Sequence, residues 1–215
     1  MKALVTAGPT HEPIDPVRFI GNQSSGKMGI AIADELAAKG FDVTLIIGPT
    51  SLKPTHTQIK QIPVQTAAEM FEACKQYFLL NDVIVFAAAV ADYTPKNPSS
   101  VKIKKKEEEF LLELVKTKDI AAETGKLKNN KQVTVGFALE TNDEFSNAKQ
   151  KLENKNLDFI VLNSTNDKGA GFGHDTNKIT IIDRQGNVIN FELKSKAEVA
   201  KDIVNYISKI INGKN

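Results

Sequence analysis

Short apolar runs alternate with helical patterns along most of the chain. Apolar runs of strand length lie at residues 2–8, 41–48, 59–64, 82–90, 133–140 and 157–164. Apolar residues recur with helical spacing at residues 28–40, 66–78, 143–156 and 196–211. Strands that alternate with helices of crossover length predict an α/β fold: a Rossmann-like, doubly wound, mostly parallel sheet between two helical layers, three layers in all.

Local signals support these boundaries. Thr66, with Glu69 three residues later, is a capping box at the start of the second helix, and Gly40 ends the first. The run DVIVFAAAV, residues 82–90, is apolar enough for a strand buried on both faces.

Two segments depart from the alternation and predict added β-hairpins. These are VKIKKKEEEFLLELVK, residues 101–116, and KITIIDRQGNVINFELK, residues 178–194, the second with a turn at 185–187. The tripeptide Gly-Pro-Thr occurs at residues 8–10 and 48–50, each time just after a strand, where open α/β sheets bind ligands. We expect one domain over residues 1–215.

The composition narrows the class of protein to which this chain can belong. With 41% hydrophobic and 25% charged residues, the chain resembles an ordinary globular protein, and it has no apolar run of about 18 residues that would span a membrane. The first residues lack a secretion signal, and the single cysteine, Cys74, suits a reducing compartment, so we expect a cytoplasmic protein. A net charge of +2 and 7% aromatic residues do not favour a nucleic-acid partner.

The stretch GNQSSGKMG, residues 21–29, comes close to a Walker A loop. Met28 stands where that loop needs a hydroxyl, and the stretch does not follow its strand directly, so we exclude this class of nucleotide site. The glycine pattern G-x-G-x-x-G is missing, and no acidic residue ends the second strand. These absences count against an NAD(P)-binding oxidoreductase, which we keep as the alternative function.

The same stretch has the groups of an anion site. Ser24, Ser25 and Gly26 lie where the first helix begins, so that backbone N–H groups and hydroxyls face a ligand together, and Asn22 adds an amide. Simple N-capping by Ser24 or Ser25 is the competing interpretation.

Two further segments can contact a ligand. AAAVADYTP, residues 87–95, places small residues and Asp92 after a buried strand, which permits close approach of a ligand but equally fits tight packing and a cap. Lys102–Lys106 would present Lys102, Lys104 and Lys106 on one face of a strand, for a triphosphate or as a solvated edge. The three histidines have no metal-ligand spacing, no Ser-His-Asp or Cys-His pattern is present, and we assign no metal ligands.

Taken together, VTAGPTHEPIDPVRFIGNQSSGKMG, AAAVADY, KIKK, VGFALET and the K-x3-K-N-L-D segment closely resemble phosphopantothenoylcysteine synthetase of coenzyme A biosynthesis, in its bacterial, CTP-dependent form. The resemblance covers nearly the whole chain. It implies a ligase that activates the carboxylate of 4′-phosphopantothenate with CTP as an acyl-cytidylate and then joins it to L-cysteine. Mg²⁺ would accompany CTP, and no flavin is expected. Since the chain starts at the synthetase strand, we expect a free-standing synthetase without a decarboxylase domain.

The resemblance also implies roles for particular residues. Asn22 and Lys102 would be catalytic. The substrate would contact the first glycine turn and the anion loop: Gly8, Asn22, Ser24, Ser25, Gly26 and Lys27. The nucleotide would contact Ala87, Ala88, Asp92, Lys102, Lys118, Asp119, Ile120, Ala121, Phe137, Lys151 and Lys155. The family often has N-P-D-I where this chain has Thr117-Lys118-Asp119-Ile120. The choice of CTP over ATP rests on the resemblance alone, and a homodimer is expected from the LLEL-bearing hairpin.

Overall fold

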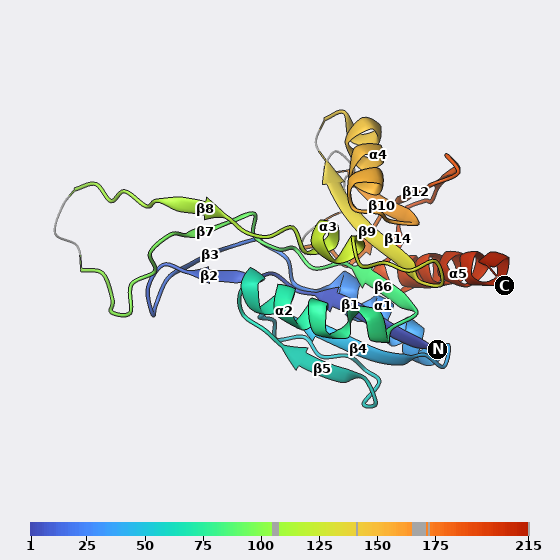
Figure 1. Cartoon of the computed structure of the whole chain (residues 1–215), viewed down its shortest axis with the longest axis horizontal. Helices are drawn as coiled ribbons and strands as arrows, with labels where there is room; N and C mark the ends of the chain where they lie inside the picture. The colour runs from blue at the N-terminus through green and yellow to red at the C-terminus, as the bar shows by residue number, and fades with distance from the viewer. Residues whose placement is uncertain (105–107, 141, 165–170, 172, 215) are drawn as a thin grey trace.

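The computed structural model describes residues 1–104, 108–140, 142–164, 171 and 173–214. Its centre is an eight-stranded sheet in the order β13-β12-β10-β9-β6-β1-β4-β5 (Figure 1). The strands are β1 (Lys2–Ala7), β4 (Asp42–Ile47), β5 (Lys60–Pro63), β6 (Val83–Phe86), β9 (Val133–Glu140), β10 (Phe159–Ser164), β12 (Thr180–Asp183) and β13 (Val188–Asn190). All neighbouring pairs from β5 to β10 are parallel, whereas β12 and β13 are antiparallel additions.

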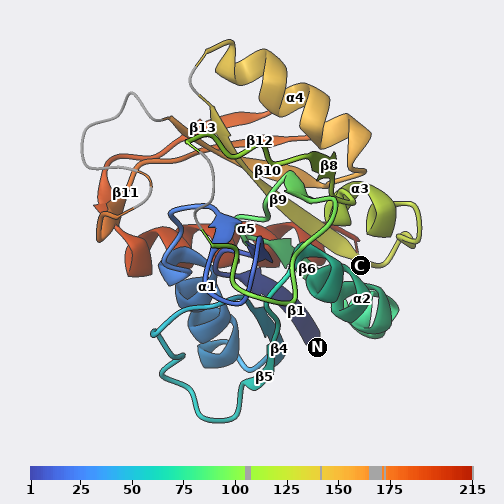
Figure 2. The ribbon, with the colours of Figure 1, turned by 90° about the vertical axis from the view of Figure 1, so that its left-hand side faces the viewer.

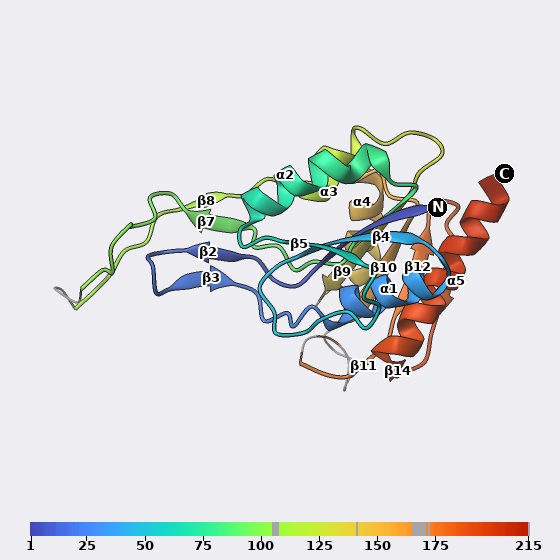
Figure 3. The same ribbon diagram turned by 90° about the horizontal axis from the view of Figure 1, so that it is seen from below.

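Helices cover both faces of the sheet, as Figure 3 shows from below. One face packs against α1 (Lys27–Ala38) and α5 (Lys196–Lys214), through residues such as Val5, Leu45 and Val85. The other packs against α2 (Ala67–Tyr77), the short 3₁₀ helix η1 (Phe78–Leu80) and α3 (Ile120–Gly125), with α4 (Glu144–Asn154) farther along the sheet. Alternate residues of β1 and β6 are buried on opposite faces, which confirms the predicted three-layer, doubly wound fold.

The predicted helix ends are confirmed in detail. Thr66 caps α2 with both halves of the capping box, because its hydroxyl accepts from the Glu69 N–H while the Glu69 carboxylate accepts from the Thr66 N–H. Gly40, with a φ of 83°, follows α1 in the left-handed conformation.

The two Gly-Pro-Thr turns pack against each other at the carboxyl edge of the sheet. Gly8 has a φ of 80°, and a side-chain carbon there would lie 3.1 Å from the Gly48 carbonyl oxygen. A side-chain carbon on Gly48 would overlap the Pro9 carbonyl. Both glycines are therefore required for the close approach of two backbones beside the ligand edge.

An arm projects from the carboxyl edge of the sheet (Figure 1). It consists of two antiparallel pairs, β2 (His11–Pro13) with β3 (Phe19–Gly21), and β7 (Tyr93–Pro95) with β8 (Leu114–Lys116). The prediction of a hairpin over residues 101–116 is wrong: among the residues of this segment that the structure describes, 114–116 are the only ones in a strand, and their partner is β7. Lys102 and Lys104 lie in irregular backbone, and Lys105, Lys106 and Glu107 lie outside the described residues.

Buried acidic groups join the segments of the arm to each other and to α2. Asp15 accepts hydrogen bonds from the Ile103 N–H at 3.1 Å and from the Arg18 guanidinium, and Arg18 donates to the Ile103 carbonyl at 3.0 Å. These contacts hold the pKa of Asp15 well below its usual range. Glu12, which is buried, accepts from the Ala67 N–H at the start of α2 at 2.8 Å. The polar residues that interrupt the apolar pattern thus position the segment that carries Lys102.

The second predicted hairpin is confirmed, with β12 and β13 joined by a turn in which Gly186 has a φ of 84°. The strand pair β11 (Thr176–Asn177) with β14 (Lys194–Ser195) was not predicted. Asp119, Ile120 and Ala121, which the resemblance assigns to the nucleotide, form the start of helix α3, with Asp119 as its N-cap; this helix was not predicted. Apolar patterning does not reveal a helix of six residues.

Candidate functional site

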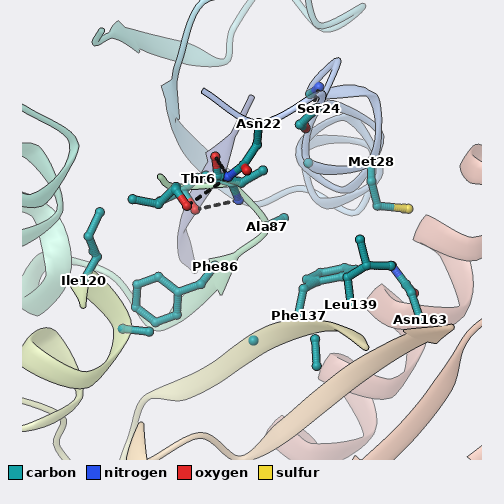
Figure 4. A pocket seen from close by; sticks show the side chains of 18 of the residues that line it. Thr6, Asn22, Ser24, Met28, Phe86, Ala87, Ile120, Phe137, Leu139 and Asn163 are labelled. Carbon is teal, nitrogen blue, oxygen red and sulfur yellow. Dashed lines mark hydrogen bonds between the residues drawn. The ribbon is translucent and has the colours of Figure 1, made fainter. Parts of the chain in front are cut away.

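A cavity of about 750 Å³ opens at the carboxyl ends of the parallel strands (Figure 4). It is lined by residues from the loop before α1, from the chain after β6, from the start of α3, from β9 and from the loops next to α5. In an open α/β sheet, this edge is where ligands bind. Figure 2 looks toward this edge, with the arm facing the viewer.

The predicted anion loop forms one wall. Gly26 is the N-cap of α1, with a φ of 79° and no side-chain cap, so the interpretation of Ser24 or Ser25 as a simple cap is wrong. The Ser24 hydroxyl instead accepts from the Gly26 N–H at 3.3 Å. The N–H groups in the first turn of α1 have no acceptor within the helix, and the residues of that turn line the cavity. A helix start of this kind favours an anion, so anion binding by this loop stays a prediction.

Gly8 lies behind this loop, outside the residues that line the cavity. A side-chain carbon on Gly26 would lie 3.1 Å from the Gly8 Cα, so two left-handed glycines pack backbone to backbone. Gly8 therefore contributes to the shape of the loop. Contact between Gly8 and a substrate remains a prediction.

Asn22 connects the anion loop to the chain after β6. Its side-chain Nδ2 donates to the Ala89 carbonyl at 3.1 Å and to the Val90 carbonyl at 3.0 Å (Figure 4). Both amide hydrogens are used in this way, so the Oδ1 atom is the part of Asn22 that can accept a hydrogen bond from a ligand.

The small residues after β6 form the floor. The Ala88 N–H donates to the Thr6 hydroxyl at 3.2 Å, which fixes this segment against β1. Ala87 and Ala88 line the cavity, with Phe137 from β9 and the exposed Asp92 nearby in the lining. Apolar rings and methyl groups next to a carboxylate suit a ligand with a flat apolar part and polar edges.

The start of α3 supplies the opposite wall of the cavity, and contact of its residues with a nucleotide stays a prediction. Asp119 accepts from the Ala122 N–H at 3.0 Å and forms an ion pair with Lys155 at 3.1 Å. The Lys118 ammonium lies 4.5 Å from the centre of the Phe71 ring, a cation–π contact. Lys118, Asp119, Ile120, Ala121 and Lys155 all line the cavity.

Two predicted residues lie elsewhere. Lys102 is on the arm, beside Ile103 and the Asp15–Arg18 pair, and Lys151 forms an ion pair with Glu140 at 2.6 Å. Neither lines the cavity, although Lys155, four residues from Lys151, does. Of the two lysines that the resemblance assigns to the nucleotide here, Lys151 lies within α4 and is paired with Glu140, whereas Lys155 is the C-cap of α4 and reaches the cavity.

Sequence reasoning missed several lining residues near the C-terminal helix. These are Met28, Asn163, Gly171, Asn177 and Lys196. Met28 is partly buried against the main core and its sulfur lies 4.0 Å from the Asn177 amide nitrogen. Met28 was considered only as the residue that departs from a Walker A loop. Asn163 lies near the end of β10, Asn177 in the two-residue strand β11, Gly171 in a bend and Lys196 at the start of α5. Only their folded positions reveal them.

The charged groups of this region include an ion pair between Lys27 and Asp175. The Lys27 ammonium lowers the pKa of Asp175. Within the described residues, no group of three or more His, Cys, Asp or Glu side chains could hold a metal ion, and no described helix is long and apolar enough to cross a bilayer.

The fold and site define a Rossmann-like α/β protein with a cavity at the carboxyl edge of its sheet, lined in part by the glycine- and serine-rich loop before α1. More narrowly, the chain belongs to the family described as the DNA/pantothenate metabolism flavoprotein C-terminal domain, which matches residues 1–211. The crystal structure of the C-terminal domain of the coenzyme A biosynthesis bifunctional protein CoaBC is similar. It is 39% identical, has a TM-score of 0.83, and the match covers 99% of this chain and 96% of that one.

Two curated relatives extend the comparison. A cysteine/cysteine sulfinic acid decarboxylase from an unknown prokaryotic organism is 55% identical over 211 residues, 98% of this chain and 59% of the relative. The bifunctional protein CoaBC of Bacillus subtilis (strain 168) is 44% identical over 207 residues, 96% of this chain and 51% of the relative. The chain thus spans little more than half the length of these relatives.

Proposed function

We propose that this chain is a phosphopantothenate–cysteine ligase of coenzyme A biosynthesis that uses CTP and acts in the cytoplasm. One observation carries the proposal: the anion loop and the nucleotide segments, far apart in sequence, line a single cavity. The likeness to the C-terminal domain of CoaBC supports the same function.

The reaction has two steps. A carboxylate oxygen of 4′-phosphopantothenate attacks the α-phosphorus of CTP, and pyrophosphate leaves. The amine of cysteine then attacks the acyl carbon of the acyl-cytidylate, CMP leaves with the carboxylate oxygen, and the nitrogen loses a proton. Aligning two anions and neutralising their charge is most of what the protein must do. This agrees with a site built from backbone N–H groups and lysines.

Asn22 acts between the two substrates in this scheme. Because its Nδ2 atom is held by the Ala89 and Val90 carbonyls, its Oδ1 atom accepts a hydrogen bond from the incoming amine. Ala87, Ala88 and Phe137 contact the nucleoside, and Asp92 binds a ribose hydroxyl or a metal-bound water. Lys118, Asp119, Ile120, Ala121 and Lys155 form the nucleotide wall.

Mg²⁺ fits this site as a companion of the triphosphate. It is usually held by one or two carboxylates together with phosphates and water, and Asp92 and Asp119 both line the cavity. When bound, the ion would neutralise part of the triphosphate charge.

We further propose a homodimer in which the arm of one copy completes the cavity of the other. Lys102 lies on the arm and not in the cavity of its own chain. The arm also exposes large apolar side chains, among them Val101 (69%), Phe110 (56%) and Leu111 (93%). Apolar side chains gathered on one projecting element are typical of an interface.

Pyrophosphate release tests the ligase proposal. It is measured with Mg²⁺ and 4′-phosphopantothenate, with CTP or ATP, and with or without cysteine. We expect release with CTP that is sustained only when cysteine is present. Release with ATP alone would overturn the choice of nucleotide, and no release with either would overturn the ligase proposal and make NAD(P) binding the next measurement.

Complementation tests the role of the arm. Lys102→Gln and Asn22→Asp are each expected to be inactive alone. When they are mixed and allowed to exchange subunits, about a quarter of the wild-type activity should return, because half the dimers are mixed and each has one intact site. No recovery, with exchange shown by mass, would mean that Lys102 does not act in the partner's cavity.

A further inference from the structure

Lys196 is a buried cation that the proposed reaction does not yet use. It is the first residue of α5, only 6% exposed, and it lines the cavity on the side opposite α3. A lysine is rarely buried to this extent unless its charge is compensated. The groups that compensate the charge of Lys196 therefore indicate which kind of ligand binds beside it.

The contacts of the Lys196 ammonium are neutral. Nζ donates to the His174 carbonyl at 2.6 Å and to the Gly171 carbonyl at 3.1 Å. An ammonium has three N–H groups, and the contacts with described residues occupy two of them, which leaves a third for another acceptor. Within the described residues, no carboxylate forms an ion pair with Lys196.

A second lysine adds to the positive charge. Burial lowers the pKa of Lys196, and the charge of Lys27 lowers it further. Lys27 also lines the cavity and pairs with Asp175, whose side chain is 86% exposed. The Asp175 carbonyl accepts from the Lys196 backbone N–H at 2.9 Å, so Lys27, Asp175 and Lys196 form one cluster. The one carboxylate in this cluster is solvent-exposed and paired with Lys27; its charge raises the pKa of Lys196, but burial and the charge of Lys27 outweigh that effect.

The cluster lies next to the anion loop. Lys27 is the first residue of α1, and the N–H groups of that first turn, together with Ser24, line the same side of the cavity. Two cations and a helix N-terminus converging on a cavity favour a group with several charged oxygens.

We propose that Lys196, with Lys27 and the first turn of α1, forms a phosphate subsite between α1 and α5. This rests on the proposed function only for the identity of the ligand, which is the phosphate of phosphopantothenate or a phosphate of the nucleotide. The third N–H of Lys196 donates to a phosphate oxygen, while the other two hold the Gly171 and His174 carbonyls in place. A purely structural lysine would do only the second.

Direct binding separates these roles without requiring turnover. The full chain is titrated by calorimetry with 4′-phosphopantothenate and pantothenate, and with CTP and cytidine. Lys196→Gln removes the charge and keeps an amide that can donate to the two carbonyls. Lys196→Arg restores the charge, and Lys201→Gln makes the same charge change at an exposed position of α5.

We expect Lys196→Gln to weaken binding of one phosphorylated ligand about tenfold and to leave its dephosphorylated counterpart unchanged. Lys196→Arg should restore most of that affinity, and Lys201→Gln should change neither. The ligand pair whose difference in affinity disappears in Lys196→Gln identifies the molecule that supplies the phosphate. Three outcomes would overturn the subsite. Lys196→Gln could weaken binding of both members of each pair equally, or weaken binding of none of the four ligands, or the wild-type chain could bind each phosphorylated ligand no more tightly than its dephosphorylated counterpart. Failure of the ligase assay alone would leave it standing.

Discussion

The K-N-L-D segment gives a stability prediction that can be worked out from its contacts. Asp158 forms an ion pair with Lys128 at 2.6 Å, and the two side chains are only 12% and 7% exposed. The same carboxylate oxygen accepts from the Thr134 N–H at 2.7 Å, and Lys128 also donates to the Asn156 carbonyl at 3.0 Å. This pair joins the starts of β9 and β10 behind the wall that carries Lys155.

Replacing Asp158 by Asn keeps the shape but removes the charge. The Lys128 ammonium stays buried with the Asn156 carbonyl and without the carboxylate. Removing one partner of a buried ion pair costs about 3–5 kcal/mol, and the slight exposure here favours the lower end, about 3 kcal/mol. This is a large part of the roughly 5–15 kcal/mol that stabilises a typical domain.

The assay is urea unfolding followed by far-ultraviolet circular dichroism. Glu123→Gln is the matched control, since Glu123 and Lys126 form an ion pair at 2.6 Å with side chains 44% and 67% exposed. We expect that control to lose less than about 0.5 kcal/mol. Adding Lys128→Met to Asp158→Asn should recover part of the loss, because no buried charge then remains at the pair. A loss below about 1 kcal/mol for Asp158→Asn, or an equal loss for Glu123→Gln, would refute the reasoning.

Three further predictions concern other parts of the molecule. Gly48→Ala should abolish folding or strongly destabilise the chain, because the added carbon overlaps the Pro9 carbonyl. Gly186→Ala has open space around it and should lower the free energy of unfolding by only about 1 kcal/mol. Equal urea midpoints for the two variants would contradict this. Burial would raise the pKa of Asp183, but hydrogen bonds from Tyr206 and Asn187 outweigh it and lower that pKa. The free energy of unfolding should therefore fall as the pH drops below about 4, and it should fall less steeply in Tyr206→Phe. The same pH dependence of unfolding in both proteins would argue against the contact. Burial raises the pKa of the Cys74 thiol to about 12, so it should react with a thiol reagent at pH 8 only in urea; rapid reaction of the folded chain would show that the site is open.

Most of the main sheet was predictable because its strands and helices carry their own hydrophobic period. Runs such as residues 41–48 and 133–140 can only be buried strands at that length, and Thr66 with Glu69 marks a helix start without tertiary information. The β2–β3 pair gave no such signal. Its strands have three residues each, and their positions depend on distant contacts such as that of Glu12 with the start of α2.

The residues of the candidate site also separate into some that the sequence could reveal and others that it could not. The loop around Ser24, Ser25 and Gly26 stood out in the sequence because a helix cap needs one serine, whereas this stretch has two serines, two glycines and an asparagine, and in the structure it lines the cavity. Lys196 could not, since a lysine near the start of a helix is ordinary in sequence and becomes unusual only when it is buried. Lys102 was assigned by resemblance, and no pattern in the chain could show that it lies on an arm outside its own cavity.

The charges of the cavity bear on whether one chain is sufficient. Among the described lining residues, five are lysines and two are aspartates: Lys27, Lys116, Lys118, Lys155, Lys196, Asp92 and Asp119. A nucleoside triphosphate and a phosphorylated carboxylate bring more negative charge than this excess of three can neutralise, even with one Mg²⁺, because each terminal phosphate carries close to two charges. Additional cations are therefore needed when both substrates are bound. An arm that carries Lys102 and exposes apolar side chains can supply them from a second copy, so the complementation experiment tests the charge balance and the dimer together.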